Sequence, residues 1–151
     1  MIAAAKALQV GATIGKQEMF PNDSGRISST WGGGDIVNSI IGYKTLEIIL
    51  RDKLWEHAEQ MGSYFLGELR KLQKEHDIIT DVRGLGLMDA LEFNTQQIRD
   101  GFEEECFKHG LMVLGCGYRA LRILPPLDVK QRELDMAVEV LDKVAKRMKQ
   151  Q

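Results

Sequence analysis

The spacing of apolar residues changes near residue 77, and this change limits the folds that the chain can adopt. From residue 35 to residue 76, apolar residues recur every three or four positions, which is typical of amphipathic helices. Residues 77–93 then change period around a glycine-containing kink, which predicts two joined strands. Long helices followed by grouped strands indicate an α+β fold.

The predicted elements continue in this way to the end of the chain. We predict helices over residues 35–52, 53–76, 96–109 and 130–150, and strands within 78–93 and over 111–114 and 120–124. Pro125 and Pro126 end the last strand, because proline lacks the N–H that a sheet requires, and glycines at 115 and 117 predict a turn. The helices are expected to pack on one face of a small sheet in a domain spanning 35–151. Residues 1–34 fit this unit poorly and are predicted to belong to another one.

The composition argues against several classes of partner. Twenty Lys and Arg against 22 Asp and Glu give a net charge of -2, and the basic residues are spread out, so we predict no nucleic-acid partner. No apolar run reaches the roughly 20 residues of a membrane span, so we predict no membrane segment. Cys106 and Cys116 lack metal-binding spacing, and His57, His76 and His109 are expected at the surface. We therefore predict no metal site and a reduced, cytoplasmic protein.

Residues 26–35 read R-I-S-S-T-W-G-G-G-D and combine hydroxyls, glycines and a helix start. Such residues can form an anion site, because small residues let a ligand approach the backbone and the helix N-terminus favours phosphate. The alternative is a plain loop in which Asp35 caps the following helix.

The predicted helix over residues 35–52 is apolar around more of its circumference than one core requires. A helix of this kind is covered on two sides, by its own domain and by a second chain. We therefore predict a homo-oligomer, a dimer in its simplest form.

Four short patterns follow one another along the chain. They are A-A-A-K at 3–6, S-S-T-W-G-G at 28–33, D-V-R-G-L-G-L-M at 81–88 and L-R-I-L-P-P-L at 121–127. In these patterns and their order the chain resembles the C-terminal half of class III pyridoxal-phosphate-dependent aminotransferases. The motifs are most similar to those of lysine 6-aminotransferase and 4-aminobutyrate aminotransferase. The resemblance implies that residues 35–151 are the C-terminal small domain of a fold-type I transferase. Residues 1–34 would be a remnant of the large cofactor domain with its connecting loop.

The resemblance also implies roles for individual residues. Lys6 matches the lysine that binds pyridoxal 5'-phosphate covalently and then moves the proton between substrate and cofactor. Ser29 and Thr30 match hydroxyl residues that reach the phosphate of the cofactor held by the other subunit. Arg122 matches the arginine that binds the substrate carboxylate through two parallel hydrogen bonds. Arg83 matches a position that is mainly structural.

The implied reaction transfers an amino group from an ω-amino acid, such as lysine, ornithine or 4-aminobutyrate, to a 2-oxo acid. The family's other cofactor-binding residues precede the lysine, so the chain alone is expected to be incomplete and inactive. A separate N-terminal cofactor domain is then a candidate partner. The alternative is a non-catalytic dimerisation or regulatory module derived from this domain, and a third reading is an unrelated α+β domain.

Overall fold

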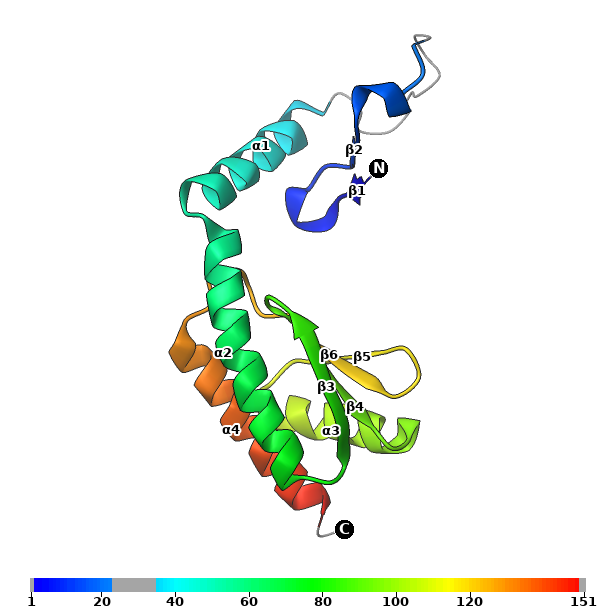
Figure 1. Ribbon diagram of the computed structural model, residues 1–151, viewed down its shortest axis with the longest axis vertical. Coiled ribbons are helices and arrows are strands. Elements are labelled where there is room, and N and C mark those ends of the chain that lie inside the picture. The colour runs from blue at the N-terminus through cyan, green and yellow to red at the C-terminus, as the bar shows by residue number, and fades with distance from the viewer. Residues whose placement is uncertain (1, 23–34, 150–151) are drawn as a thin grey trace. The chain divides into compact units, whose positions relative to one another are not determined.

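The computed structural model describes residues 2–22 and 35–149, which form parts of two compact units (Figure 1). The first unit is Met1–Lys53 and the second is Leu54–Gln151. Within the described residues, no helix is both long and apolar enough to cross a membrane.

The first unit contains a small hairpin and one long helix. Strands β1 (Ile2–Ala4) and β2 (Ala12–Ile14) pair antiparallel, and the 3-10 helix η1 (Lys6–Leu8) lies in the loop between them. A second 3-10 helix, η2 (Gln17–Met19), follows β2, and the unit ends with α1 (Ile36–Arg51).

Helix α1 packs against the loop of the hairpin through the buried Gly42. A Cβ atom at Gly42 would lie 2.7 Å from the Cγ1 atom of Val10, so only glycine permits this close approach. The predicted helix over 35–52 is therefore present, but it belongs to the same compact unit as the N-terminal segment. The boundary between the units lies after Lys53, whereas the sequence prediction placed a domain boundary after residue 34.

The second unit is built on a four-stranded antiparallel sheet in the order β3-β4-β6-β5. The strands are β3 (Ile79–Leu85), β4 (Met88–Phe93), β5 (Leu114–Cys116) and β6 (Ala120–Ile123). Gly86, with a φ of 58°, lies in the two-residue turn that joins β3 to β4. This turn confirms the predicted pair of strands joined at a glycine.

Three helices cover one face of this sheet: α2 (Leu54–Glu75), α3 (Gln96–Lys108) and α4 (Gln131–Met148) (Figure 1). Alternate residues of β4, such as Leu91 and Phe93, are fully buried beneath them. The rings of Phe93 and Phe102 of α3 pack with their centroids 4.8 Å apart. This arrangement confirms the α+β prediction of helices packed on a small sheet, and the pairing shows that the sheet is antiparallel.

In the second unit, the starts of α3 and α4 show local capping. The Thr95 hydroxyl accepts a hydrogen bond from the backbone N–H of Ile98 at the start of α3. At the start of α4, the Glu133 carboxylate accepts from the backbone N–H of Lys130 at 2.8 Å.

The predicted strand over residues 111–114 was wrong in its position, since β5 begins only at Leu114. Leu111 continues the end of α3 instead, where its N–H donates to the carbonyl of Cys106, and Val113 is buried in the core. Gly115 was predicted in a turn but lies within β5. A Cβ atom there would meet the Arg99 guanidinium at 1.7 Å, so the strand needs glycine at this position.

Candidate functional site

The face of the sheet opposite the helices carries a row of four residues, one from each strand. Arg83 of β3 is paired with Ala90 of β4, Ala90 with Arg122 of β6, and Arg122 with Leu114 of β5. Residues paired across strands point to the same face of a sheet. The two arginines therefore flank the small side chain of Ala90, which leaves room beside them.

Arg122 is exposed, and no carboxylate of the described residues pairs with it. The other two arginines near this face are neutralised. Arg83 contacts Asp81 at 2.6 Å and Glu92 at 2.7 Å, and Arg119 contacts Glu92 at 2.8 Å. Arg122 is thus the guanidinium on this face that remains available to an external carboxylate.

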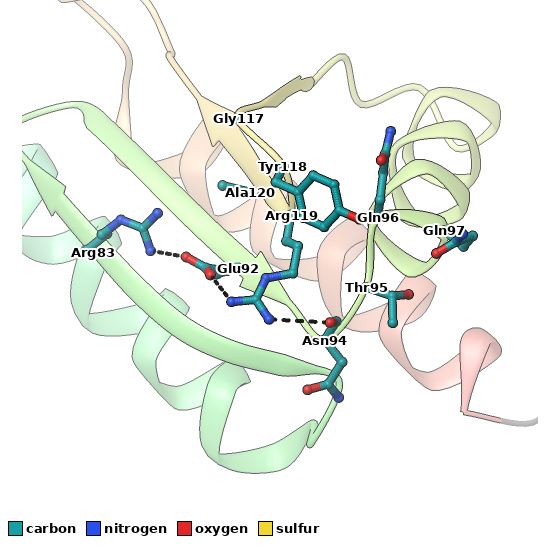
Figure 2. A pocket seen from close by; sticks show the side chains of 10 residues that line it. All are labelled: Arg83, Glu92, Asn94, Thr95, Gln96, Gln97, Gly117, Tyr118, Arg119 and Ala120. Carbon is teal, nitrogen blue, oxygen red and sulfur yellow. Dashed lines mark hydrogen bonds and ion pairs between the residues drawn. The ribbon is translucent and has the colours of Figure 1, made fainter.

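A pocket of 640 Å³ opens next to this ion-pair network (Figure 2). Figure 2 shows Glu92 between the guanidinium groups of Arg83 and Arg119, with Tyr118 and Asn94 nearby. The hydrogen bond from Arg83, reinforced by Arg119, holds the pKa of the Glu92 carboxyl below its usual value. The sequence prediction missed this network, because Glu92 and Arg119 are 27 residues apart and carry no motif that links them. The two ion pairs of Arg83 agree with the structural role expected for it.

Lys6 is the first residue of η1 and has a left-handed backbone, with a φ of 59°. This conformation costs about 1–2 kcal/mol for a residue with a side chain. The turn is held by Gln9, whose backbone N–H donates to the Lys6 carbonyl at 2.8 Å and whose side-chain amide donates at 3.3 Å. The Lys6 side chain is exposed, and within the described part of the chain no acidic group pairs with it.

Ser29 and Thr30 lie outside the described residues, as does most of the proposed anion-binding stretch. Its last residue, Asp35, caps α1: one carboxylate oxygen accepts from the backbone N–H groups of Val37 at 3.0 Å and Asn38 at 3.2 Å. The capping role anticipated for Asp35 is therefore confirmed. These two N–H groups are already used and do not contribute to an anion site.

The second unit buries polar groups that the sequence did not lead us to expect in the interior, among them His76 and Asp89. The prediction that His76 lies at the surface was wrong: it is 5% exposed, because α2 ends there and its imidazole contacts Asp142 of α4. Asp89 of β4 is 1% exposed, and neither of its carboxylate oxygens has a hydrogen-bond partner. Burial raises the pKa of Asp89 to about 6.

Comparison with known proteins gives relatives over nearly the whole chain. Residues 1–145 match the family model described as Aminotransferase class-III. Acetylornithine aminotransferase of Methanothermobacter thermautotrophicus is 34% identical over 139 residues, which cover 89% of this chain and 34% of that protein. L-lysine-epsilon aminotransferase of Amycolatopsis lactamdurans is 36% identical over 150 residues, covering 93% of this chain and 33% of that protein.

Solved structures show the same similarity. The lysine aminotransferase from M. tuberculosis, in the internal aldimine form, is 30% identical with a TM-score of 0.76, covering 82% of this chain and 28% of that one. The chain thus spans about a third of the length of the curated relatives that it matches. It belongs to the class-III aminotransferase family.

Proposed function

We propose that this chain supplies the C-terminal part of a pyridoxal-phosphate-dependent enzyme that transfers an amino group from an ω-amino acid to a 2-oxo acid. The observation that carries the proposal is Arg122, an exposed guanidinium without an ion pair among the described residues, on a family-matched stretch of sheet. A planar guanidinium binds a carboxylate through two parallel N–H···O bonds. Both substrates of an aminotransferase carry such a carboxylate.

Lys6 fits the cofactor by its chemistry. Its side chain is an exposed primary amine, and no described carboxylate competes for it. Pyridoxal 5'-phosphate, when bound, withdraws electrons from the carbon that bears the substrate's amino group. In this proposal Lys6 holds the cofactor through its Nζ atom and, once released, carries the proton at that substrate carbon. The hydroxyls of Ser29 and Thr30 are proposed to donate to the cofactor phosphate across a subunit interface.

The names of the relatives support the substrate class. They are aminotransferases of lysine, acetylornithine, ornithine and 4-aminobutyrate. These compounds share an amino group on a terminal carbon, separated from a carboxylate by an aliphatic chain. Arg122 is proposed to bind the carboxylate and so to direct the terminal amine away from the sheet. A charge-assisted contact of this kind contributes about 1.5–3 kcal/mol.

The exposed surface of α1 supports a dimer. Large apolar side chains lie exposed along this helix, with Ile36 74% exposed and Leu50 64% exposed. Side chains of this kind are normally covered by a partner. The exposed apolar residues of α1 are Ile36, Val37, Ile40, Ile41, Tyr43, Leu46, Ile48 and Leu50. The same surface supports the alternative function, in which the chain is a non-catalytic dimerisation or regulatory module.

A chimera tests the proposal. This chain replaces the matched third of the Amycolatopsis lactamdurans L-lysine-epsilon aminotransferase, so that the relative supplies the remaining two-thirds. The chimera is assayed for transfer from lysine, ornithine and 4-aminobutyrate to a 2-oxo acid, and for the visible absorbance of bound cofactor. We expect turnover of at least one of these donors, and the Lys6→Ala variant should lose both activity and the protein-bound absorbance.

Arg122→Lys separates carboxylate binding from cofactor binding. We expect the KM for the amino donor to rise about 10- to 100-fold, which corresponds to the loss of one charge-assisted, two-point contact, while the cofactor absorbance stays unchanged. Arg132→Lys on α4 serves as the matched control, since Arg132 is exposed and outside the sheet. A folded, dimeric chimera that binds cofactor but turns over no donor would instead favour the non-catalytic module.

A further inference from the structure

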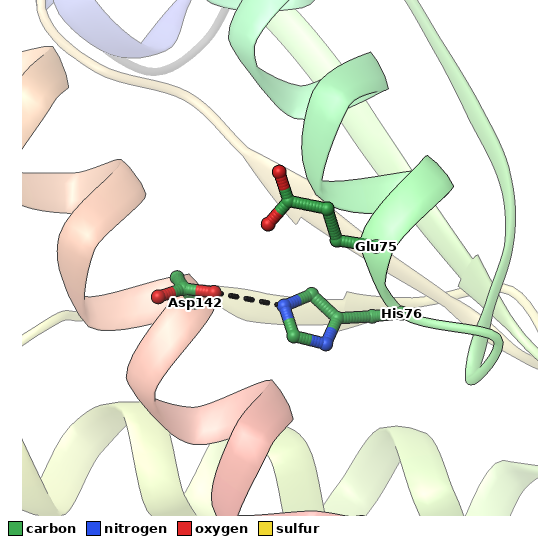
Figure 3. Close-up of side chains that lie close together, drawn as sticks. All are labelled: Glu75, His76 and Asp142. Atoms are coloured by element: carbon green, nitrogen blue, oxygen red, sulfur yellow. Dashed lines mark hydrogen bonds and ion pairs between the residues drawn. The ribbon is translucent and has the colours of Figure 1, made fainter.

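Three side chains with metal-binding atoms converge where α2 ends beside α4. Glu75 is the last residue of α2, His76 follows it, and Asp142 projects from α4 (Figure 3). Their ligand atoms all lie within 4.8 Å of one another. Figure 3 shows the imidazole of His76 directed at Asp142, with the Glu75 carboxylate beside them.

The chemistry of this cluster suits a transition-metal ion. An imidazole and carboxylates are the ligands that Zn²⁺ uses when three protein groups bind it and water completes a tetrahedron. His76 is 5% exposed, so its ring is held in place, and its Nε2 atom lies 2.8 Å from the Oδ1 atom of Asp142. In a tetrahedral site with bonds of about 2.1 Å, ligand atoms lie about 3.4 Å apart. Small side-chain rotations would bring these atoms to that spacing.

A helix C-terminus and a pocket that could hold a water ligand adjoin the cluster, and two lysines also line that pocket. The C-terminus of α2 places the negative end of the helix dipole beside the cluster. A pocket of 370 Å³, lined by Glu75, His76, Lys146 and Lys149, adjoins the three ligands. One cation already contacts the cluster, since the Lys146 ammonium lies 2.5 Å from the second carboxylate oxygen of Asp142.

We propose that Glu75, His76 and Asp142 form a binding site for Zn²⁺ or a divalent ion of similar preference. The Nε2 atom of neutral His76 and one oxygen from each carboxylate bind the ion, and water from the adjoining pocket completes the coordination. Lys146 competes with the metal for Asp142 and turns toward solvent when the metal binds. The bound ion ties the end of α2 to α4 and so stabilises the two helices against separation. The site includes neither Lys6 nor Arg122 and does not depend on the proposed aminotransferase reaction.

Calorimetric titration of the metal-free chain with Zn²⁺ tests the site. We expect saturable 1:1 binding and a zinc-dependent rise in Tm. Glu75→Gln and Asp142→Asn should each weaken binding at least about 10-fold, because each removes a charged ligand. Lys146→Met should strengthen binding, because it removes the competing ammonium.

His109→Gln is the matched control for adventitious binding to histidine. His109 is the C-cap residue of α3 and is not part of the proposed site, so its replacement should leave the zinc affinity unchanged. Circular dichroism of each variant verifies that the helices are intact. Three results would overturn the site: absence of saturable binding by the wild type, binding that survives in both carboxylate variants, or weaker binding in Lys146→Met.

Discussion

Replacing Asp89 by Asn should stabilise the protein at neutral and alkaline pH and much less in acid. The carboxylate lies in β4 on the helix-covered face, 1% exposed, without a hydrogen-bond partner for either oxygen. It packs closely against Gly84 of β3: a Cβ atom at Gly84 would lie 1.9 Å from the Oδ1 atom of Asp89. An ionised carboxylate in this position loses its hydration and gains no compensating contact.

The pKa shift gives the size and the sign of the effect. Burial raises the pKa of Asp89 from 3.8 to about 6, so the folded state holds this proton more tightly than the unfolded chain. Above the folded-state pKa, the ionised Asp89 therefore lowers the free energy of unfolding by its full amount. This cost falls as the pH drops through 6 toward 3.8. One unit of pKa shift corresponds to about 1.4 kcal/mol, so ionised Asp89 lowers the free energy of unfolding by about 3 kcal/mol at pH 8 and by about 1 kcal/mol near pH 4.5. Asn cannot ionise, so Asp89→Asn should remove a pH dependence of about 2 kcal/mol over this interval.

Urea unfolding followed by far-ultraviolet circular dichroism measures this difference, because α2, α3 and α4 all belong to the unit that contains Asp89. The free energy of unfolding is compared between wild type and Asp89→Asn at both pH values, so that other titrating groups cancel. Asp128→Asn is the control. Because Asp128 is exposed, its replacement should cause only a small change in the free energy of unfolding, of the same size at both pH values. Destabilisation by Asp89→Asn at pH 8, or an equal gain at both pH values, would refute the burial argument.

Other predictions concern packing and association. Gly62→Ala should destabilise the protein by about 1–3 kcal/mol or more, because its Cβ atom would lie 2.0 Å from the carbonyl oxygen of Gly86. Gly67→Ala, in the same helix with open space around it, should instead stabilise by about 0.5–1 kcal/mol; thermal unfolding compares the two. Phe102→Ala should cost about 3–5 kcal/mol in urea unfolding, since its ring is fully buried against Phe93. Ile40→Asp on α1 should convert the proposed dimer to monomer in sedimentation, with little loss of helix content, and an unchanged dimer would exclude α1 as the interface.

Hydrophobic spacing predicted the helices well because each has a broad apolar stripe and a clear end. The helix predicted over 96–109 corresponds to α3 (Gln96–Lys108), and Gly110, with a φ of 84°, follows it as expected for a helix end. Within α3, Cys106 is fully buried but the neighbouring Phe107 is 67% exposed. The reason is geometric: neighbouring residues point about 100° apart on a helix, so Phe107 cannot share the direction of the buried Cys106.

The errors in the predicted sheet arise from side chains distant in sequence. Apolar residues before β5 indicated a strand, but Val113 is apolar because it fills the core. Gly115 indicated a turn, but its missing side chain makes room for the Arg99 guanidinium of α3. A local pattern cannot distinguish a glycine that permits a turn from one that permits a distant side chain to approach.

Residues of the candidate site and its surroundings were predictable only where their position depends on the local sequence and not on contacts with distant elements. Arg122 lies in the strand predicted over residues 120–124, just before a pair of prolines, so its place on a strand could be predicted from the sequence. The burial of His76 and Asp89 did not, because each depends on an element far along the chain. His76 is covered at the end of α2 and contacts Asp142, 66 residues later.

On the open face of the sheet, ion pairs neutralise two arginines and leave a third unpaired among the described residues. Three guanidinium groups lie on or beside this face, and two carboxylates, Asp81 and Glu92, neutralise Arg83 and Arg119. The remaining positive charge is therefore concentrated at Arg122, beside the small Ala90, with its donors unused by the described residues. A carboxylate ligand loses hydration when it binds, and it recovers that cost best at a guanidinium that gives up no existing ion pair. Among the arginines on or beside this face, Arg122 is thus the one that could bind a carboxylate, as proposed, without giving up an ion pair to a described residue.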